Sequence, residues 1–316
     1  MSTIATWNLE NLFRPGTEFG PSDAATYDAK LTGLAAVIDG LAPDVLAVQE
    51  VGDPDALADL VVRLDGEWET ALSTVFEADH PIRVALLARH PLTDVEQVSR
   101  FPAKLAPVQV DDAGATMQAM GRGALRARVT LDGEAVDIVT CHLKSKLLGF
   151  PDGRFSPHDE GERARYAVYA LHRRGVEAAT VRAYADGLLD GHGGDRAVIV
   201  LGDLNDEILA ATTQILLGPP GSEIGTAGFD RPDRGDACRL WDLAPLIAPD
   251  RRFSRVFDGR RELIDHILTS RRLVTRAVRV DTAGDPPPSI GSDPAARRNA
   301  PASDHAPVVA EFGPGA

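Results

Sequence analysis

Short apolar runs and helix-like stretches alternate along the first part of the chain. The run from Ile4 to Trp7 predicts a first strand. From Tyr27 to Leu41 the apolar residues recur at helical spacing, which predicts a helix that ends before Pro43. A strand from Val45 to Gln49 follows, so the chain opens with a strand, a helix and a second strand.

The same patterns predict a second helix and further strands. Asp53 followed by Pro54 has the residue types of a helix N-cap and first helical position. Several later runs are almost continuously apolar, which is typical of sheets that are covered on both faces. These runs predict strands at 83–87, 125–131, 135–140, 197–201, 263–268 and 307–312.

The second half of the chain contains one long helical stretch and one long loop. The helix is predicted from Ser156 to Leu189, with Gly175 as a candidate break. The segment from Gly284 to Ala302 contains three consecutive prolines and is predicted to be a loop, because a strand-like run follows it. The chain shows no internal repeat and no linker-like boundary, so we expect a single domain over residues 1–316.

Polar residues stand at or beside the ends of six apolar runs. They are, in chain order, Asn8, Glu50, His142, the pair Asp203 and Asn205, Asp265, and the pair Asp304 and His305. In α/β sheets, side chains at strand ends lie at a rim outside the core, where loops can close over a ligand. We therefore expect these side chains to form one site.

The residue types at these strand ends favour a hard metal ion. Glu50, Asp203 and Asp304 are carboxylates, and Asn8 and Asn205 offer neutral amide oxygens. Such donors suit Mg²⁺ or Mn²⁺ better than zinc, and a cation would relieve the repulsion among clustered carboxylates. The remaining histidines show no zinc-ligand spacing.

Six segments carry these residues and resemble, in the same order, the magnesium-dependent endonuclease/exonuclease/phosphatase superfamily. They read TWNLENLF (6–13), DVLAVQEV (44–51), VTCHLKSK (139–146), VLGDLND (200–206), LIDHIL (263–268) and SDHAPV (303–308). The resemblance implies an α/β (α+β) fold, namely a four-layer α/β/β/α sandwich with two central mixed sheets and the active site at one end. It also implies metal-dependent hydrolysis of phosphoester bonds.

Matched residue by residue, the resemblance implies how the metal and the attacking water would be held. Glu50 would be the principal Mg²⁺ ligand, with Asn8 and Asp304 near the ion and the scissile phosphate. Asp203 would orient or deprotonate the water. Asn205 would hold that water or a phosphate oxygen.

The resemblance also implies roles for the histidines and basic residues. His305 would contact the phosphate, with its orientation fixed by Asp265. His142 would donate to a phosphate oxygen or protonate the leaving group. Arg122 resembles the family arginine that approaches the substrate phosphate, and Lys144 would share a strand face with His142 if that strand continued.

The sequence departs from the family in two places. Deoxyribonuclease I-like nucleases pair the histidine that matches His142 with a carboxylate on an earlier strand, which here reads PIRVALLA and offers no acid. We therefore expect His142 to be oriented by backbone or to act mainly as a donor. The region from about 147 to 195 is expected to be a helical insertion that influences substrate choice.

Composition limits the partners and the location. The 316 residues include 33 Lys and Arg against 47 Asp and Glu, a formal net charge of −14, so there is no overall basic footprint for nucleic acid. No apolar stretch is long enough for a membrane span, and MSTIATWNLENLF lacks the features of a signal peptide, which predicts a cytoplasmic protein. Two cysteines without CxxC spacing predict no disulfide framework.

Four polar residues near the motifs have a structural explanation. Strand alternation turns His266 and Cys141 away from the site residues beside them, so both are predicted to be core residues. Arg163 and Arg165 fit a phosphate contact at a helix start, but they fit a solvated charged face at least as well.

The leading hypothesis is a Mg²⁺- or Mn²⁺-dependent phosphodiesterase whose phosphoester substrate is DNA or RNA. The alternative is a phosphatase or phosphodiesterase for a small-molecule or lipid head-group phosphate. The acidic charge and the 5% aromatic content favour this alternative, because single-strand binders stack bases on aromatic rings. A third hypothesis, an inactive scaffold, predicts loss of Glu50, Asp203 or His305, and all three are present.

Overall fold

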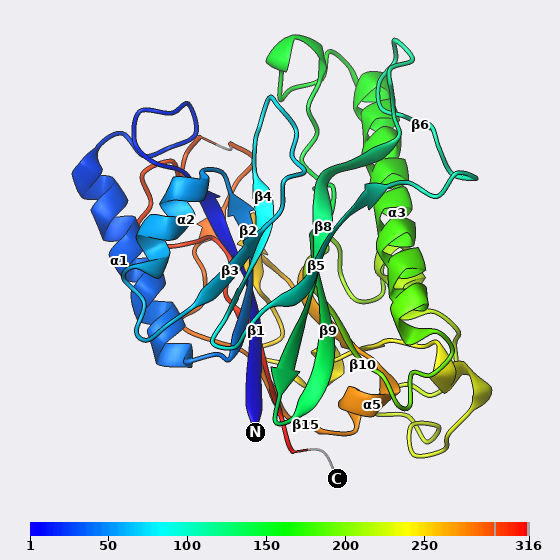
Figure 1. Ribbon diagram of the computed structural model, residues 1–316. Coiled ribbons are helices and arrows are strands. Elements are labelled where there is room, and N and C mark those ends of the chain that lie inside the picture. Colours follow the sequence, from blue (N-terminus) through cyan, green and yellow to red (C-terminus); the bar gives the residue numbers. More distant parts are fainter. Residues whose placement is uncertain (294, 315–316) are drawn as a thin grey trace.

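Two six-stranded sheets stack face to face at the centre of the computed structural model, which describes residues 1–293 and 295–314 (Figure 1). In spatial order the first sheet contains β15 (Ala277–Thr282), β17 (Val308–Phe312), β1 (Ser2–Leu12), β2 (Val45–Val51), β4 (Arg83–Ala88) and β3 (Glu69–Leu72). The second contains β11 (Trp241–Asp242), β14 (Asp265–Thr269), β10 (Ala197–Asp203), β9 (Glu134–His142), β8 (Ala119–Leu131) and β5 (Thr93–Arg100). Both sheets are mixed, because β1 is parallel to β2 and β9 is parallel to β10, whereas the other neighbours are antiparallel.

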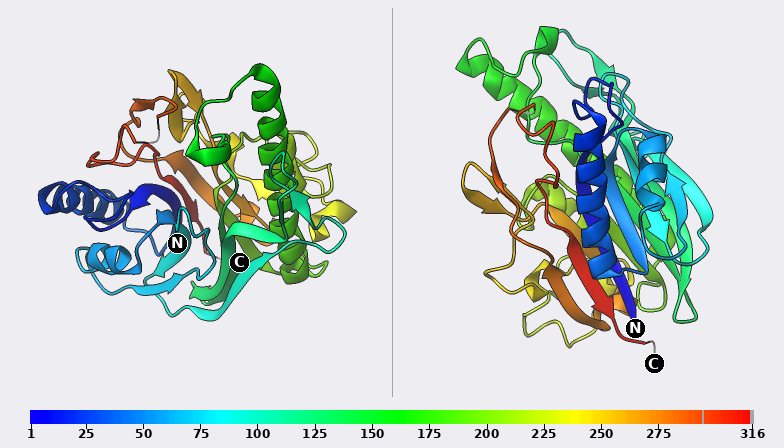
Figure 2. Two further views of the ribbon diagram at one scale, coloured as in Figure 1. Left: turned by 90° about the horizontal axis from the view of Figure 1, so that it is seen from above. Right: turned by 90° about the vertical axis from the view of Figure 1, so that its left-hand side faces the viewer.

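Helices cover the outer face of each sheet and complete four layers (Figure 2). The first sheet is covered by α1 (Ala24–Leu41) and α2 (Pro54–Val61), and the second by α3 (Glu160–Leu189) and α4 (Ala211–Leu217). This arrangement confirms the α/β/β/α sandwich expected from the sequence. None of the helices described combines the length and the hydropathy that a membrane span requires.

Side-chain alternation along the strands explains why their sequences are almost continuously apolar. In β1, Ile4 faces the opposite sheet and Ala5 faces the helices of the first sheet. In β10, Ile199 faces the first sheet and Val200 faces α3. Burial of each such large aliphatic side chain contributes roughly 1.5 to 3 kcal/mol, so both faces of each strand stabilise the sandwich.

The helix starts follow local capping. The Asp53 side chain accepts a hydrogen bond from the Asp55 N–H (2.8 Å), and Pro54 is the first residue of α2, as predicted. The Asp159 side chain caps α3 in the same way, through the Glu162 N–H (2.8 Å). For this reason α3 begins at Glu160, later than the predicted Ser156.

The long helix α3 is a layer of the sandwich. It runs unbroken through Gly175, and it buries Val176, Val181 and Leu189 against the outer face of the second sheet. The part of the region 147–195 that α3 occupies therefore belongs to the outer layer, and an insertion at about 147–195 stays a prediction. Only the segment before α3, with its short 3₁₀ turn at Pro151–Gly153, stands apart from the layers.

The remaining elements are short and lie in the connecting segments. They are β6 (Val108–Gln109) and β7 (Thr116–Met117), the three-stranded group β12 (Arg255–Phe257), β13 (Arg260–Glu262) and β16 (Ser289–Ile290), α5 (Arg271–Val274), and 3₁₀ turns at Arg234–Ala237 and Ala244–Leu246. The segment 284–302, predicted to be a loop, contains β16, and its residue 294 lies outside the described residues. The predicted strand 263–268 begins at Asp265.

His266 faces away from its neighbour Asp265, as strand alternation predicts. Its Nδ1 lies 2.7 Å from Asp242 Oδ2, and its Nε2 lies 2.9 Å from the Asp206 carbonyl oxygen. Both ring nitrogens meet acceptors, and only the protonated imidazole can donate to both. Burial opposes this charge, but Asp242 and the two hydrogen bonds outweigh it and raise the pKa of His266 to about 9.

We expect His266 to make stability depend on pH. A pKa raised from 6.5 to about 9 on folding contributes stability that is complete below about pH 6.5 and disappears as pH rises through 9. In urea denaturation, wild type should exceed His266→Gln in free energy of unfolding by about 3 kcal/mol more at pH 6 than at pH 9.5. The exposed His172→Gln is the control. An equal difference at both pH values would refute the charged pair.

Candidate active site

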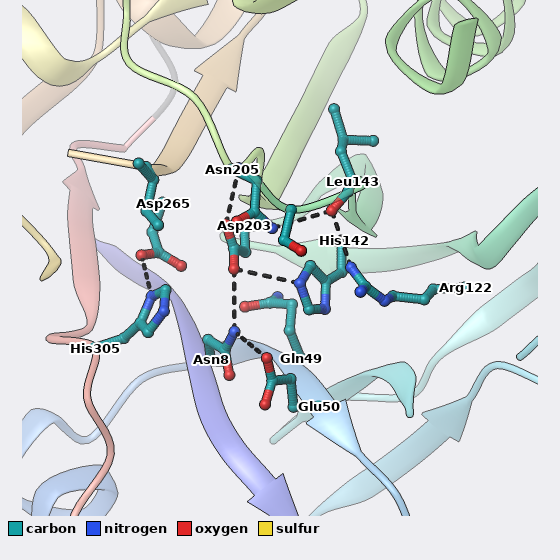
Figure 3. A network of polar contacts seen from close by, with 12 residues as sticks. Asn8, Gln49, Glu50, Arg122, His142, Leu143, Asp203, Asn205, Asp265 and His305 are labelled. Carbon is teal, nitrogen blue, oxygen red and sulfur yellow. Dashed lines mark hydrogen bonds and ion pairs between the residues drawn. The ribbon is translucent and has the colours of Figure 1, made fainter. Parts of the chain in front are cut away.

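Strand direction brings the predicted residues to one end of the sandwich (Figure 3). The parallel pairs β1–β2 and β9–β10 end there, and the antiparallel β14 and β17 begin there. Asp203 on β10 is the register partner of both His142 on β9 and Asp265 on β14. His305 stands just before β17, which pairs with β1.

Two residues of the site have left-handed backbone. Glu50 has φ 62° and lies where the pairing of β2 with β4 shifts register between Val48 and Val51. Asn205, just after β10, has φ 54°. Asparagine tolerates this conformation, whereas for glutamate it costs on the order of 1 kcal/mol. The bulge in β2 re-aims Glu50 toward the site.

Asn8 links the carboxylates of the two sheets. Its Nδ2 donates to Glu50 Oε1 and to Asp203 Oδ2, both at 3.0 Å, and its Oδ1 accepts from the Glu10 N–H at 2.9 Å. The side chain is buried, so its rotamer is fixed by three hydrogen bonds. One lone pair of Oδ1 is left for a metal ion or a substrate.

Glu50 is held as an ionised carboxylate at the edge of this network. It is partly exposed, and its Oε2 accepts from the Asn11 N–H at 2.8 Å. Desolvation would raise its pKa, but the Asn8 hydrogen bond and the charges of His305 and Arg122 lower it below the usual value. Glu50 therefore offers a negative oxygen at neutral pH.

Asp203 occupies the centre of the site. It is 1% exposed, and its Oδ1 accepts from the Asn205 N–H at 2.9 Å. Burial and the charge of Asp265 raise the pKa of Asp203 to about 6, against the lowering effect of His305 and Asn8. The group is thus mostly ionised at neutral pH and is a stronger base than an ordinary aspartate.

His305 and Asp265 form a buried pair. The His305 Nδ1 lies 2.6 Å from Asp265 Oδ2, and the His305 Nε2 lies 3.9 Å from Asp304 Oδ1. Burial disfavours the imidazolium, but Asp265, Asp304 and Asp203 outweigh it and raise the pKa of His305 to about 10. His305 is therefore cationic at neutral pH, with its ring fixed by Asp265.

His142 has the opposite electrostatic environment. Its Nε2 is 3.4 Å from Asp203 Oδ2, and its buried Nδ1 has no hydrogen-bond partner among the residues described. Burial, Arg122 and His305 lower its pKa well below 6.5, so the ring is neutral. Of the two expectations for His142, orientation by backbone is not seen among the described residues, and action mainly as a donor stays a prediction.

Arg122 and Asn205 converge on one carbonyl. Arg122 Nη1 donates to the Leu143 carbonyl oxygen at 2.9 Å, and Asn205 Nδ2 donates to the same oxygen at 3.0 Å. Figure 3 shows both side chains beside His142. Through this shared acceptor, Arg122 and Asn205 lie side by side in the site although they are far apart in sequence.

Lys144 does not share a strand face with His142, because β9 ends at His142. Its Nζ donates instead to the carbonyl oxygens of Ser145 (3.2 Å) and Leu147 (2.8 Å). Burial, Arg122 and Arg173 lower the pKa of Lys144 to about 7. The strand-based argument for its role was therefore wrong, although Lys144 remains close to Arg122.

The residues fit a divalent cation. Within the described ranges, no Lys or Arg forms an ion pair with Glu50, Asp203 or Asp304. The neutral His142 lies 3.4 Å from Asp203, and the cationic His305 lies 3.9 Å from Asp304. His305 is the cation nearest to these carboxylates, and carboxylates that lack a Lys or Arg partner favour a metal ion. Among the described residues, Asp203, Asp265 and His305 form a group of possible metal ligands whose ligand atoms lie within 4.8 Å of one another. Asp265 and His305 are already hydrogen-bonded to each other, which favours the Glu50 side.

Three residues near the site lie outside the sequence prediction. Ser303 Oγ donates to the Asn8 carbonyl oxygen (2.7 Å) and accepts from the His305 N–H (3.0 Å), while Trp7 Nε1 donates to the His305 carbonyl oxygen (2.8 Å). Trp7 and Ser303 stand inside the matched segments, so their position was a usable signal. His80 contacts Asn11 Oδ1 at 2.9 Å from a loop, where no strand-end pattern marks it.

Cys141, Arg163 and Arg165, for which the sequence also offered a structural explanation, lie outside the site. Cys141 is fully buried in the core beneath α3, and burial raises the pKa of its thiol. Arg163 pairs with Glu160 on the helix surface, and Arg165 pairs with Asp112 at 2.9 Å. The solvated-face explanation therefore holds for both arginines.

Comparisons with known proteins agree on the fold. The model of the Endonuclease/Exonuclease/phosphatase family matches residues 5–305. No curated protein sequence matches the chain. Among solved structures, the catalytic domain of human Nocturnin with bound sulfate is 17% identical, with a TM-score of 0.59 over 99% of this chain and 94% of that one.

Two bacterial structures are similar over nearly the whole of both chains. The Bacteroides thetaiotaomicron mannosyl-6-phosphatase is 15% identical, with a TM-score of 0.58 and coverage of 99% and 100%. A 3′ phosphatase from Neisseria, bound to a product DNA hairpin, is 19% identical, with a TM-score of 0.55 and the same coverage. At these identities the likeness shows a shared fold.

Removal of the Asp265 charge should change the titration of His305. In Asp265→Asn the pKa of His305 should fall by roughly one to three pH units, because an opposite charge in contact shifts a pKa by that amount. NMR titration of the His305 ring protons measures it. His266 is the internal comparison: it keeps its hydrogen bond to Asp242 and loses only the smaller effect of the Asp265 charge, so its pKa should fall by less than that of His305. An unchanged His305 titration would mean that Asp265 does not hold the proton.

Proposed function

The chain belongs to the Endonuclease/Exonuclease/phosphatase family, as its six segments predicted, and we propose that it is a Mg²⁺- or Mn²⁺-dependent phosphodiesterase that cleaves DNA or RNA. One observation carries this proposal: Asn8 joins Glu50 to Asp203, Asp304 lies 3.9 Å from His305 of the His305–Asp265 pair, and in the part of the chain described none of these three carboxylates has a Lys or Arg partner. Such a site can bind a hard cation and a phosphate together.

In this proposal Glu50 is the principal metal ligand, with Asn8 and Asp304 beside it. Glu50 is ionised, partly exposed and fixed by hydrogen bonds at both oxygens. A divalent ion there would neutralise phosphate charge and polarise the scissile bond. Its charge would also relieve the repulsion between Glu50 and its acidic neighbours.

Asp203 and Asn205 are proposed to handle the attacking water. With a pKa near 6, Asp203 is ionised at neutral pH and can accept the proton that the water loses. One N–H of the Asn205 side-chain amide donates to the Leu143 carbonyl oxygen, which fixes the plane of the amide. Its Oδ1 is then available to accept from the water, and its second N–H to donate to a phosphate oxygen.

His305, Arg122 and His142 are proposed to stabilise the phosphate. His305 is a fixed cation and needs no proton transfer to counter the charge that builds on the equatorial oxygens. Arg122 brings a second cation from the neighbouring strand. The lowered pKa of His142 favours a neutral hydrogen-bond donor over an acid that protonates the leaving group.

The substrate class has two candidates. The family includes nucleases as well as phosphatases, and a nucleic acid is supported by the fold shared with the Neisseria phosphatase that binds a DNA hairpin. A small phosphoester is favoured by the net charge of −14 and the low aromatic content, and the mannosyl-6-phosphatase has the same fold. The two share the same catalytic residues and differ in what contacts the rest of the substrate.

Metal removal and one substitution test the proposed ligand. Hydrolysis should vanish in EDTA and return with Mg²⁺ or Mn²⁺, and Glu50→Gln should raise the Mg²⁺ concentration for half-maximal activity by roughly tenfold or more, because it removes the main anionic ligand. Mn²⁺ binding by calorimetry should weaken in parallel.

Glu67→Gln makes the same chemical change at an exposed position outside the site and is the control. Full activity in EDTA would contradict the metal proposal. An unchanged Mg²⁺ titration in Glu50→Gln, with normal folding, would move the ion to other ligands.

A substrate panel tests the choice of nucleic acid. If DNA or RNA is the substrate, kcat/KM should be at least about tenfold higher on plasmid or oligonucleotide than on bis-p-nitrophenyl phosphate, because remote binding energy lowers the barrier. Kinetics with Mg²⁺ at low and moderate salt measure this. Faster cleavage of p-nitrophenyl phosphate than of any diester would favour the phosphatase instead.

A further inference from the structure

The peptide group between Leu143 and Lys144 is held from both sides. Its carbonyl oxygen accepts from Arg122 Nη1 (2.9 Å) and Asn205 Nδ2 (3.0 Å), while its N–H donates to Glu177 Oε2 (2.6 Å). A peptide group is planar, so fixing the N–H direction also fixes the direction of the carbonyl. Glu177 therefore sets the acceptor to which two site residues are bound.

Glu177 reaches this peptide from the outer layer of the sandwich. It lies on α3, is 1% exposed, and its Oε1 accepts from Arg173 Nε at 2.9 Å. Arg173 Nη2 in turn lies 2.7 Å from Glu77 Oε1, in the loop before β4. These contacts satisfy a buried carboxylate and link the helix, the loop and the strand ends.

The neighbouring backbone shows how closely this ion pair is fitted. Glu177 Oε1 is also 3.5 Å from the Gly121 nitrogen, next to Arg122. A Cβ on Gly121 would lie 2.1 Å from Arg173 Nη2 and 2.4 Å from Glu77 Oε1, so any other residue there would displace these side-chain ends from their present positions. The Lys144 carbonyl oxygen accepts from Arg174 Nη1 at 2.9 Å, so α3 holds both backbone groups of Lys144.

Stability alone gives little reason for a carboxylate at this position. The helix is already anchored by apolar residues such as Val176 and Val181, and a buried ion pair contributes little net stability compared with well-packed apolar groups. A charged acceptor on the N–H, however, polarises the peptide and strengthens its carbonyl as an acceptor. That effect acts directly on Arg122 and Asn205.

We propose that Glu177 is a positioning residue for the reaction, which orients Arg122 and Asn205 through the Leu143–Lys144 peptide. It contacts neither side chain directly and needs no contact with substrate. The inference rests on the proposed function in one respect, namely that Arg122 and Asn205 act on the phosphate or the water.

Glu177→Gln tests the inference in kinetics. It should lower kcat by roughly tenfold or more with little change in KM, because small misplacements of catalytic groups cost up to about a hundredfold. Asp137→Asn is the matched control, because it also removes the charge of a buried carboxylate that is bound to an arginine. Asp137 lies on β9, five residues before His142, and accepts from Arg126 Nε at 3.0 Å. It should cost stability and leave kcat unchanged.

A double-mutant cycle and one spectrum decide between positioning and a purely structural role. In an Asn205→Ala background, Glu177→Gln should cost much less than in wild type; full additivity would overturn the inference. In NMR spectra without substrate, the Asn205 side-chain amide signals should shift in Glu177→Gln and stay in place in Asp137→Asn. Unmoved Asn205 signals would also overturn it.

The spectrum separates this inference from the proposed function. An inactive wild type would contradict the phosphodiesterase proposal, while the Asn205 signals would still decide whether Glu177 positions that side chain. Should Glu177→Gln fail to fold, Glu177→Asp keeps the charge but is one methylene shorter. It should show the same displaced Asn205 signals, and unmoved signals in that variant would overturn the inference.

Discussion

The amide of Asn8 joins two carboxylates that belong to different sheets. Its two N–H groups point to Glu50 on the first sheet and Asp203 on the second, both at 3.0 Å. Without this donor, each carboxylate would keep a backbone N–H, from Asn11 or Asn205, but the two acidic groups would face each other with nothing shared between them. The low pKa of Glu50 and the orientation of Asp203 both depend in part on that contact, which links the ends of the two sheets.

Around Asn8, the two histidines differ in protonation state at neutral pH, and the two carboxylates differ in pKa. Asp265 and its acidic neighbours make His305 a cation, while Arg122 and burial keep His142 neutral. Asp203 is a weaker acid than Glu50, because it is buried beside Asp265. Two histidines and two carboxylates thus offer a cation, a neutral donor, a base and a ligand. Such divergence is typical of acid–base sites.

Much of this arrangement could be predicted from the sequence, because strand ends and polar residues coincide. The apolar runs before Asn8, Glu50 and Asp203 predicted three strands, and the motif order indicated the fold that the family match confirms. The conformation of Lys144 could not be predicted, because whether β9 continues past His142 is decided by tertiary contacts. Nor could β5, whose residues are mostly exposed and lack an apolar pattern.

The role inferred for Glu177 shows a second limit. It is 33 positions from Lys144 in sequence and lies on a helix that also buries Arg173, Arg174 and Arg182. No local pattern marks one carboxylate on such a helix as different from its neighbours. Only the fold, which places α3 over the ends of β8 and β9, reveals the contact.

At Glu50, whose backbone is left-handed, selection for chain stability and selection for activity favour different residues. A glycine or an asparagine would adopt φ 62° with less strain than a glutamate, so chain stability alone favours replacing this residue. At Asn205 the residue type already suits its φ of 54°, and no such opposition exists. Engineering for heat resistance that scores folding only would therefore reward the loss of the carboxylate at position 50 while leaving position 205 alone. Variants from such a programme should be assayed for turnover at every round, since a more stable chain can be one that has lost its site.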